Sequence, residues 1–361
     1  MENTINMKIE NFKKPKEKSK FPSEFRLDLV SKDWVIVATG RARRPETFKR
    51  VKRKKDEISR KKCPFCQKDL VDTASLVFSN NKKIPLKTLS IFKKKLNNWT
   101  TIAIPNKFPA FLPASRLETK IEGGLYQKIN AIGFHEIIVT RDHEKSIALL
   151  SISKIKELID VYQERFLYLM KQKFVSYIAI FHNHGFEAGA SISHPHSQIA
   201  AIPLIDTDLR AGLSNSKNFF KKERECMYCL MCEWERRVKT RIIFENEDFS
   251  ILCPFASKAA FEVIISPKKH SAYFEKIQEK EKWNLAEALK IALSKIYKGL
   301  NDPPYNFYLH TAPCDGADYD FYHWHFTILP KTSTWAGFEL GAGMEISTIE
   351  PEKAAEYLRK Q

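Results

Sequence analysis

The hydrophobic pattern of the chain alternates between short β-branched runs and longer segments with helical periodicity, as in proteins that mix strands and helices. In the first half, residues 99–104 and 133–139 have the composition of strands. Apolar residues at 3.6-residue spacing from 152 to 169 then predict a helix, and the hydroxyl of Ser151 is a suitable cap for it. Residues 177–181 follow as a buried strand. The predicted unit is a group of strands with one long helix.

The same order of features returns in the second half of the chain. Strand-like runs at residues 249–253 and 261–266 precede a helical segment at about residues 275–298, and a strand at 306–310 follows it. We infer an internal duplication of one α+β unit, because the repeat is too long and the copies too few for a solenoid. The expected organisation is a basic disordered tail at residues 1–22, an N-terminal domain at 23–205 and a C-terminal domain at 206–361.

Composition narrows the class of protein. With 361 residues, 43% of them hydrophobic, the chain can bury a sizeable core. No apolar run reaches the roughly 18 residues of a membrane span. The lysine-rich N-terminus lacks the apolar stretch of a secretory signal, so we expect a cytoplasmic protein with no membrane partner.

The formal net charge of +17 raises the alternative of a nucleic-acid-binding protein, whose binding would weaken steeply with salt. The excess of Lys and Arg is concentrated at residues 13–20, 41–62 and 93–95, which have the composition of a tail and loops. A solvated surface with a site for phosphate-bearing small molecules accounts for this distribution of charge better than a nucleic-acid interface does. Nucleic-acid binding is therefore kept as a remote alternative.

Four of the seven cysteines form two C-x-x-C pairs, a spacing typical of zinc ligands. Each pair is followed by two histidines, which lie 51 positions apart in the first half and 53 in the second. Because Cys₂His₂ is a common closed zinc set, two zinc ions per chain are expected. The rival interpretation, a redox dithiol, does not require the histidines. The expected ligands are Cys63, Cys66, His143 and His194 in the first half, and Cys226, Cys229, His270 and His323 in the second.

The first H-x-H stretch, His194-Pro-His196, places two imidazoles on one face if the segment is extended. With His194 assigned to the metal, His196 remains as a nucleophile toward phosphorus, and Gln198 can donate to a phosphate oxygen. The alternative for His196 is a second metal ligand or a satisfied core histidine. Backbone N–H or hydroxyl donors from Gly189 and Ser191, arginines Arg41 and Arg44 after a strand, and Asn106 are further candidates for substrate contacts.

These motifs together resemble the galactose-1-phosphate uridylyltransferases of the histidine-triad superfamily. The resemblance rests on Gly189-Ala-Ser, His194-Pro-His196-Ser-Gln198, Cys63-Pro-Phe-Cys66, Asp142-His143 and Asn183-His-Gly, and it covers almost the whole chain. It implies a duplicated histidine-triad (HIT-like) fold of the α+β class, in which each half is an antiparallel sheet with a long helix. It also implies a homodimer, and the cysteine pair of the second half matches the type with two Cys/His zinc sites.

The resemblance implies a ping-pong reaction in which a histidine takes uridylate from UDP-glucose and passes it to galactose 1-phosphate. An ADP-glucose phosphorylase-like branch, which transfers adenylyl groups to phosphate, is the alternative. By position, His196 is the nucleophile and Gln198 its phosphate-binding partner. The implied nucleotide and phosphate contacts are Arg41, Arg44, Asn106, Asn183, Gly189 and Ser191.

Overall fold

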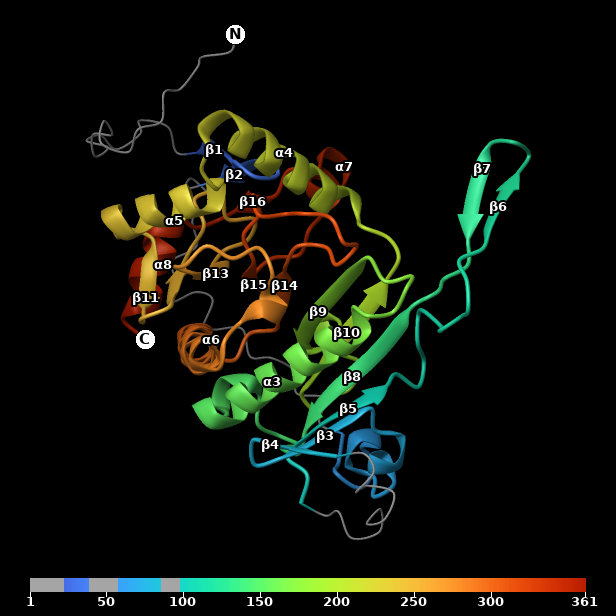
Figure 1. Cartoon of the computed structure of the whole chain (residues 1–361). Helices are drawn as coiled ribbons and strands as arrows, with labels where there is room; N and C mark the ends of the chain where they lie inside the picture. Colours follow the sequence, from blue (N-terminus) through green and yellow to red (C-terminus); the bar gives the residue numbers. More distant parts are fainter. Residues whose placement is uncertain (1–22, 39–57, 86–97) are drawn as a thin grey trace.

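The centre of the computed structural model, which describes residues 23–38, 58–85 and 98–361, is a sheet of eleven strands. Neighbouring strands pair antiparallel throughout this sheet. Their order is β11-β12-β13-β15-β14-β9-β10-β8-β5-β3-β4 (Figure 1). The strands are β3 Leu76–Ser79, β4 Lys82–Ile84, β5 Thr101–Pro105, β8 Phe134–Thr140, β9 Tyr177–His184, β10 His196–Ile202, β11 Ile242–Glu245, β12 Phe249–Leu252, β13 Val263–Pro267, β14 Tyr305–His310 and β15 His325–Pro330.

The sheet confirms the predicted duplication. The two halves meet where β9 pairs with β14, and from this seam the strands run outward in matching order, β10, β8, β5, β3 on one side and β15, β13, β12, β11 on the other. Helix α3 Ile152–Leu169 connects β8 to β9, and α6 Glu279–Leu300 connects β13 to β14. The predicted α+β class with a duplicated histidine-triad fold is therefore observed.

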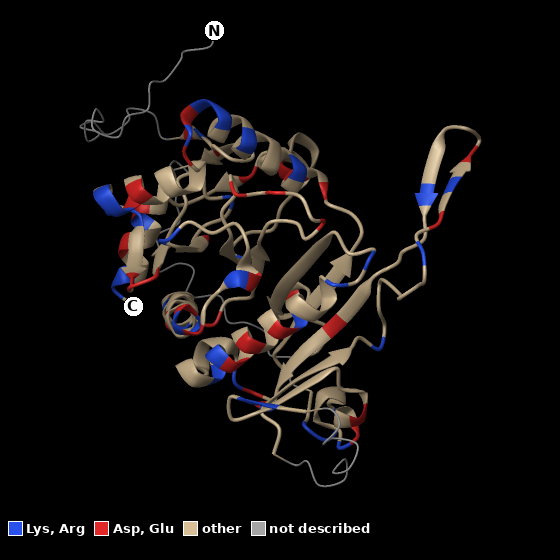
Figure 2. Ribbon diagram, viewed as in Figure 1, with Lys and Arg blue, Asp and Glu red and all other residues tan. Residues whose placement is uncertain are grey.

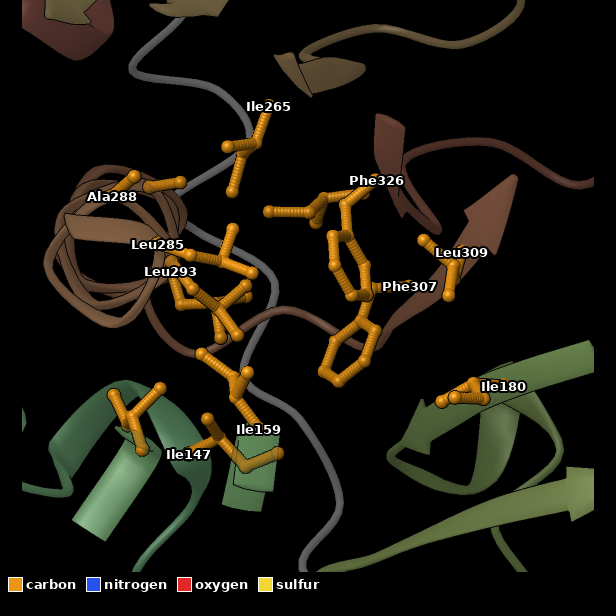
Figure 3. Packing of buried hydrophobic residues seen from close by; sticks show 14 of the residues in the cluster. Ile147, Ile159, Ile180, Ile265, Leu285, Ala288, Leu293, Phe307, Leu309 and Phe326 are labelled. Atoms are coloured by element: carbon orange, nitrogen blue, oxygen red, sulfur yellow. The ribbon is translucent and has the colours of Figure 1, made fainter. Parts of the chain in front are cut away.

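Helices α3 and α6 pack against each other on one face of the sheet (Figure 1). The side chain of Ser151 caps α3 as predicted and accepts a hydrogen bond from the Lys154 backbone N–H at 3.3 Å. One apolar cluster joins Ile159 of α3, Leu285 of α6 and Phe307 of β14, and Figure 3 shows them converging under the sheet. The main core thus crosses the boundary expected at residue 205.

Several smaller elements surround the large sheet. Strands β1, β2 and β16 form a second sheet, and β6 and β7 form an isolated hairpin that projects from the body (Figure 1). Short 3₁₀ turns connect other segments, among them η3 and η6 near the histidine strands. The bounds are β1 Glu24–Leu27, β2 Trp34–Val37, β16 Ile346–Ser347, β6 Thr119–Glu122, β7 Tyr126–Ile129, η3 Pro64–Cys66, η4 Leu70–Thr73, η5 Ile147–Leu149, η6 Phe186–Ala188, η7 Phe274–Lys276, α4 Thr207–Glu223, α5 Met227–Val238, α7 Gly337–Ala342 and α8 Pro351–Arg359.

Two details differ from the sequence-based expectations. Helices α4 and α5 were not predicted, and the second C-x-x-C is part of the start of α5 instead of a separate knuckle. The three glycines of segment 337–343 predict a turn, but the segment forms the short helix α7, because Glu339 accepts a hydrogen bond from the Ala336 N–H and Gly343 ends the helix at φ +65°. The expected tail 1–22 and most of the basic segments lie outside the described residues.

No helix in the described part of the chain is both long and apolar enough to cross a membrane.

Candidate metal centres and active site

The four ligands expected in the first half come together beside β8 and β10. Their candidate atoms, two thiols and two imidazole nitrogens, all lie within 4.8 Å of one another. Cys66 Sγ is 3.3 Å from His143 Nδ1, and His143 Nδ1 is 3.2 Å from His194 Nδ1. Tetrahedral zinc with ordinary bond lengths separates S and N ligands by about 3.6 Å and two N ligands by about 3.4 Å. The cluster has the dimensions of a Cys₂His₂ zinc site.

Backbone carbonyls fix the orientation of both rings in this cluster. The Nε2–H of His143 donates to the carbonyl of Ile58 at 2.8 Å, and that of His194 donates to the carbonyl of Thr140 at 2.8 Å. Because a carbonyl only accepts, the proton is on Nε2 and the Nδ1 lone pair is directed to the cluster. Burial lowers the pKa of His194 to about 4, so the ring is neutral, as a metal ligand must be.

The second half repeats this arrangement closer to the surface. Cys226 is the residue before helix α5, and Cys229 lies in the first turn of this helix. Cys229 Sγ is 3.3 Å from His270 Nδ1 and 3.4 Å from His323 Nδ1, while His270 itself is exposed. The Nε2–H groups again donate to backbone carbonyls, those of Asp320 at 2.7 Å and Pro267 at 3.0 Å. Both predicted ligand sets are therefore assembled by the fold.

The Cys63 thiol of the first cluster does not have the character of a reactive redox thiol. Reactive dithiols depend on a thiol whose pKa is lowered toward neutrality. Burial instead raises the pKa of the Cys63 thiol to about 11. A thiolate at this position requires a cation beside it, which favours metal binding over thiol–disulfide chemistry.

His196, the first residue of β10, has the proton arrangement of a nucleophile. Its Nδ1 lies 2.9 Å from the carbonyl oxygen of His194, which can only accept. The proton is therefore on Nδ1, and the Nε2 lone pair is available. Burial lowers the pKa of His196, which keeps the imidazole neutral. The ring of Phe65, between the two cysteines of the first cluster, packs on it with centroids 5.0 Å apart.

The neighbouring strand β9 places Asn183 next to His196, one position beyond the Ser197–His182 pair. Asn183 Oδ1 accepts a hydrogen bond from Asn306 Nδ2 at 2.8 Å, which leaves its own amide N–H₂ turned away from Asn306. Asn306 belongs to β14, so the second half supports a side chain of the first. This support could not be predicted from the sequence, because it depends on the register of the seam between β9 and β14.

The glycine-rich loop before β10 differs in one respect from the expectation. Gly189 is required there, because its φ of +88° is unfavourable for other residues. Its N–H, predicted as a phosphate donor, is already used in a 2.8 Å hydrogen bond to the carbonyl of Phe186. Ser191 and Asn183 line a cavity of about 170 Å³ together with Pro195, the residue before His196.

Gln198 and Asn106, both predicted to contact substrate, lie on either side of His135. The Gln198 Oε1 is 2.7 Å from His135 Nε2. The Asn106 Nδ2 lies 3.4 and 3.3 Å from the two nitrogens of the same ring. His135 and Asn106 line a groove of about 820 Å³. Arg41 and Arg44 lie outside the described residues.

The second half contains a counterpart of His196 in a different setting. His325 begins β15, and its Nδ1–H donates to the carbonyl of His323 at 3.2 Å. His310, opposite it on β14, stacks on its ring with centroids 4.5 Å apart. Burial lowers the pKa of both rings, and neither belongs to a metal cluster in the described part of the chain. His310 thus occupies, beside His325, the position that Asn183 occupies beside His196 in the first half.

A duplicated histidine-triad fold that presents a neutral imidazole beside a Cys₂His₂ cluster defines a nucleotidyltransferase of the histidine-triad superfamily. The chain belongs to the galactose-1-phosphate uridyl transferase family. Residues 13–204 match the N-terminal domain of that family and residues 212–360 match its C-terminal domain. The resemblance noted in the sequence is thereby confirmed.

Individual relatives fall on two branches of this family. The chain is 32% identical over 343 residues to an ADP-glucose phosphorylase of Arabidopsis thaliana, covering 93% of this chain and 92% of the relative. It is 27% identical over 346 residues to a galactose-1-phosphate uridylyltransferase of Thermotoga maritima, covering 93% and 98%. A crystal structure of an Arabidopsis ADP-glucose phosphorylase with bound ADP-glucose superposes with a TM-score of 0.74 at 29% identity, covering 94% and 99%.

Proposed function

We propose that the protein transfers a uridylyl group from UDP-glucose to a hexose 1-phosphate, galactose 1-phosphate above all, with His196 as the covalent carrier. The observation that carries this proposal is the hydrogen bond from His196 Nδ1–H to the His194 carbonyl. It leaves a neutral Nε2 as the nucleophilic atom. The family's galactose-1-phosphate uridylyltransferases, such as that of Thermotoga maritima, support the choice of substrates.

The proposed reaction has two matched displacements. The Nε2 lone pair of His196 attacks the α-phosphorus of UDP-glucose, an N–P bond forms, and glucose 1-phosphate leaves with the electrons of the broken P–O bond. A phosphate oxygen of galactose 1-phosphate then attacks the same phosphorus and displaces Nε2. Throughout, Nδ1–H remains bonded to the His194 carbonyl, which stabilises the positive charge that develops on the ring.

Hydrogen-bond donors near His196 are expected to stabilise the negative charge on the phosphoryl oxygens. We assign the Gln198 and Asn183 amides and the Ser191 hydroxyl to this role, because Gln198 follows His196 by two residues on β10 and the other two line the adjoining cavity. Gly189 contributes the tight turn, since its N–H is already bonded. Arg41 and Arg44 are proposed as further phosphate contacts, and Asn106 as a contact to ribose or base, on sequence grounds.

We also propose that both Cys/His clusters hold zinc, two ions per chain. Their dimensions and the proton positions of the four histidines suit this metal. When bound, zinc supplies a structural cross-link between segments that are distant in sequence. In the first half the residues it ties down include His194, whose carbonyl orients His196.

A second candidate reaction is favoured by the Arabidopsis relative, an ADP-glucose phosphorylase at 32% identity. In this reaction His196 takes an adenylyl group from ADP-glucose, and inorganic phosphate accepts it. The chemistry at His196 is the same, and the difference lies in the base and the acceptor. Turnover of ADP-glucose with phosphate at a kcat/KM above that of UDP-glucose with galactose 1-phosphate would establish this second candidate.

Labelling with nucleotide tests the proposal directly. Incubation with UDP-glucose carrying ³²P at the α-phosphate should give labelled protein that loses its label in acid and releases it to galactose 1-phosphate. His196→Asn should take up no label. The matched control is His325→Asn, which alters the corresponding histidine of the second half and should still be labelled. Label on His196→Asn, or none on the wild type with either nucleotide sugar, would refute the proposed function.

We further propose a homodimer located in the cytoplasm. The β6–β7 hairpin projects from the body and exposes Ile121, Leu125 and Tyr126, with 69 to 75% of each side chain accessible. An isolated two-stranded hairpin is at best marginally stable in water, so a second subunit is its expected support. Light scattering should give a mass of about twice 41.9 kDa at micromolar concentration, and a monomer mass would contradict the dimer.

Nucleic-acid binding remains the remote alternative. In the view of Figure 2, basic and acidic residues are interspersed along α3 and α5, as on a solvated surface. Ion pairs such as Lys83–Glu164 and Lys154–Asp142 neutralise part of the charge. Tight RNA or DNA binding at physiological salt, together with no label transfer, would favour nucleic-acid binding over the transferase function.

A further inference from the structure

His135 lies between Gln198 and Asn106, to both of which the proposed function assigns a substrate contact. His135 itself has no assigned role in the reaction. It is half-buried on β8, on the same sheet face as Gln198 of β10. Its Nε2 is 2.7 Å from Gln198 Oε1, which is hydrogen-bond distance. The segment after β5 folds over the other side of the ring, where Ala110 and Asn106 contact it.

The hydrogen bonds determine which nitrogen of His135 carries the proton. The backbone N–H of Ala110 points at Nδ1 at 3.3 Å, so Nδ1 must accept and has no proton. The proton is therefore on Nε2, which donates to Gln198. The Nε2–H of His135 requires an acceptor, and in an amide only the carbonyl oxygen accepts a hydrogen bond. The Oε1 of Gln198, and not its N–H₂ group, therefore faces His135.

The same contacts also hold the ring itself in place. Asn106 Oδ1 accepts from the Phe108 N–H at 3.0 Å, which turns its Nδ2 toward His135. Because Nδ2 is nearly equidistant from the two ring nitrogens, at 3.4 and 3.3 Å, it lies against the ring instead of in line with the Nδ1 lone pair. The backbone N–H of Asn106 in turn donates to the His135 carbonyl at 2.8 Å. Ring and loop are thus fixed together.

We propose that His135 is a positioning residue that holds the Gln198 amide with its N–H₂ group toward the phosphate that His196 attacks. With Oε1 bound by His135, both amide hydrogens of Gln198 are available to a non-bridging phosphoryl oxygen. Without this hydrogen bond the amide is no longer held in advance in the orientation that the transfer step requires, so its ordering is added to the barrier. This inference rests on the proposed function, since it assigns a partner to Gln198 within the same site.

Two substitutions of His135 separate its hydrogen bond from its bulk. His135→Phe keeps a ring of similar size but has no donor for Gln198 Oε1. His135→Gln places an amide N–H near the position of Nε2 and keeps the donor. The measurement is the single-turnover rate of ³²P transfer from UDP-glucose to the protein, together with the Kd of UDP-glucose. We expect His135→Phe to lower the rate by about 10²-fold with little change in Kd, as for loss of one preorganised donor, and His135→Gln to recover most of it.

A double-mutant cycle with Gln198→Leu decides whether His135 acts through Gln198. If it does, His135→Phe should lower the rate no further in the Gln198→Leu background. Losses that multiply, or a wild-type rate in folded His135→Phe, would overturn the inference. If His135→Phe fails to fold, as judged by circular dichroism, His135→Gln is compared with His135→Asn, whose amide is too short to reach Gln198; equal rates for these two would also overturn it.

Different results would refute the proposed function and the positioning role of His135. Absence of label on the wild-type protein with both UDP-glucose and ADP-glucose refutes the proposed function. A labelled wild type with an unaltered His135→Phe variant refutes only the role of His135.

Discussion

Glu262, the residue immediately before β13, carries a carboxyl group that is almost fully enclosed by protein. Burial is the largest effect and raises the pKa of this carboxyl to about 7. The hydrogen bond that the Lys258 N–H donates at 2.5 Å, and the charge of the Lys258 side chain, act in the opposite direction and lower the pKa. The nearby carboxyls of Asp28 and Glu345 raise it further. In the unfolded chain a glutamate titrates near 4.3. The folded protein therefore binds this proton more tightly than the unfolded chain.

The direction of the pH effect follows from this raised pKa. The protonated Glu262 contributes stability that is fully present below about pH 4 and is lost as the pH rises through about 7. At pH 8 the buried charge costs on the order of 3 kcal/mol. We expect Glu262→Gln to increase the free energy of unfolding at pH 8 by about 2–3 kcal/mol and at pH 5 by about 1 kcal/mol or less.

Urea denaturation at the two pH values measures this difference. Glu225→Gln, at an exposed position, is the control and should change stability by less than about 0.5 kcal/mol at either pH. An effect of Glu262→Gln that does not depend on pH would show that Glu262 is ionised in the folded protein.

At the scale of single residues, the sequence was sufficient where spacing alone defines chemistry. The two Cys/His clusters, and the exclusion of His196 from the first of them, could be predicted because C-x-x-C and H-x-H place donors locally. His135 and Asn306 could not be inferred, because their partners lie on other strands. Each acts through a cross-strand contact whose register is set by packing of the whole sheet.

Helices α3 and α6 are joined by a buried group of charges as well as by apolar contacts. The carboxylate of Asp160 on α3 accepts hydrogen bonds from Lys156 Nζ at 2.8 Å and from Lys282 Nζ of α6 at 2.7 Å. Less than 10% of each of these residues is accessible. Removal of one partner from a buried ion pair leaves uncompensated charge, whereas replacement of the whole group by apolar residues is often neutral.

We therefore expect Asp160→Ala to lower the free energy of unfolding by about 3 kcal/mol, toward the low end of the range for buried pairs because Glu279 still contacts both lysines. The triple variant Lys156→Met, Asp160→Leu, Lys282→Met should lie within about 1 kcal/mol of the wild type. Denaturant unfolding at pH 7 measures both. A triple variant less stable than Asp160→Ala would show that the charges themselves stabilise the helix pair.

Among the elements, long periodic segments were the predictable ones. Helix α3 and strands β8 and β9 begin within one or two residues of their predicted starts. Helices α4 and α5 were missed because their surface is polar and basic, so the apolar stripe is short. Helix α7 was missed because three glycines indicate a turn, and the capping contact of Glu339 that outweighs them is visible only in three dimensions.

On the scale of the whole molecule, each half carries its own Cys/His cluster, for which we propose one zinc ion. Metal analysis of the purified protein should give two zinc ions per chain, and Cys63→Ser and Cys226→Ser should each remove one. Removal of both ions by a chelator should lower the midpoint of thermal unfolding, because binding to the native state alone stabilises it. Cys253→Ser, which alters a buried cysteine outside both clusters, is the control and should keep two ions. One ion or none in the wild type would contradict the proposal.

The seam between β9 and β14 also determines when the protein can become active during its synthesis. Strand β9 is complete at His184, but its partner β14 begins at Tyr305, roughly 120 residues later. At about 5–20 residues per second the nascent chain carries β9 as an open sheet edge for about 6–24 seconds. Throughout this interval the strand of His196, the proposed nucleophile, exists without the hydrogen bond from Asn306 to Asn183. Catalytic competence is thus a late product of translation, and a chain interrupted before β14 presents an unpaired strand to the cell's chaperones and proteases.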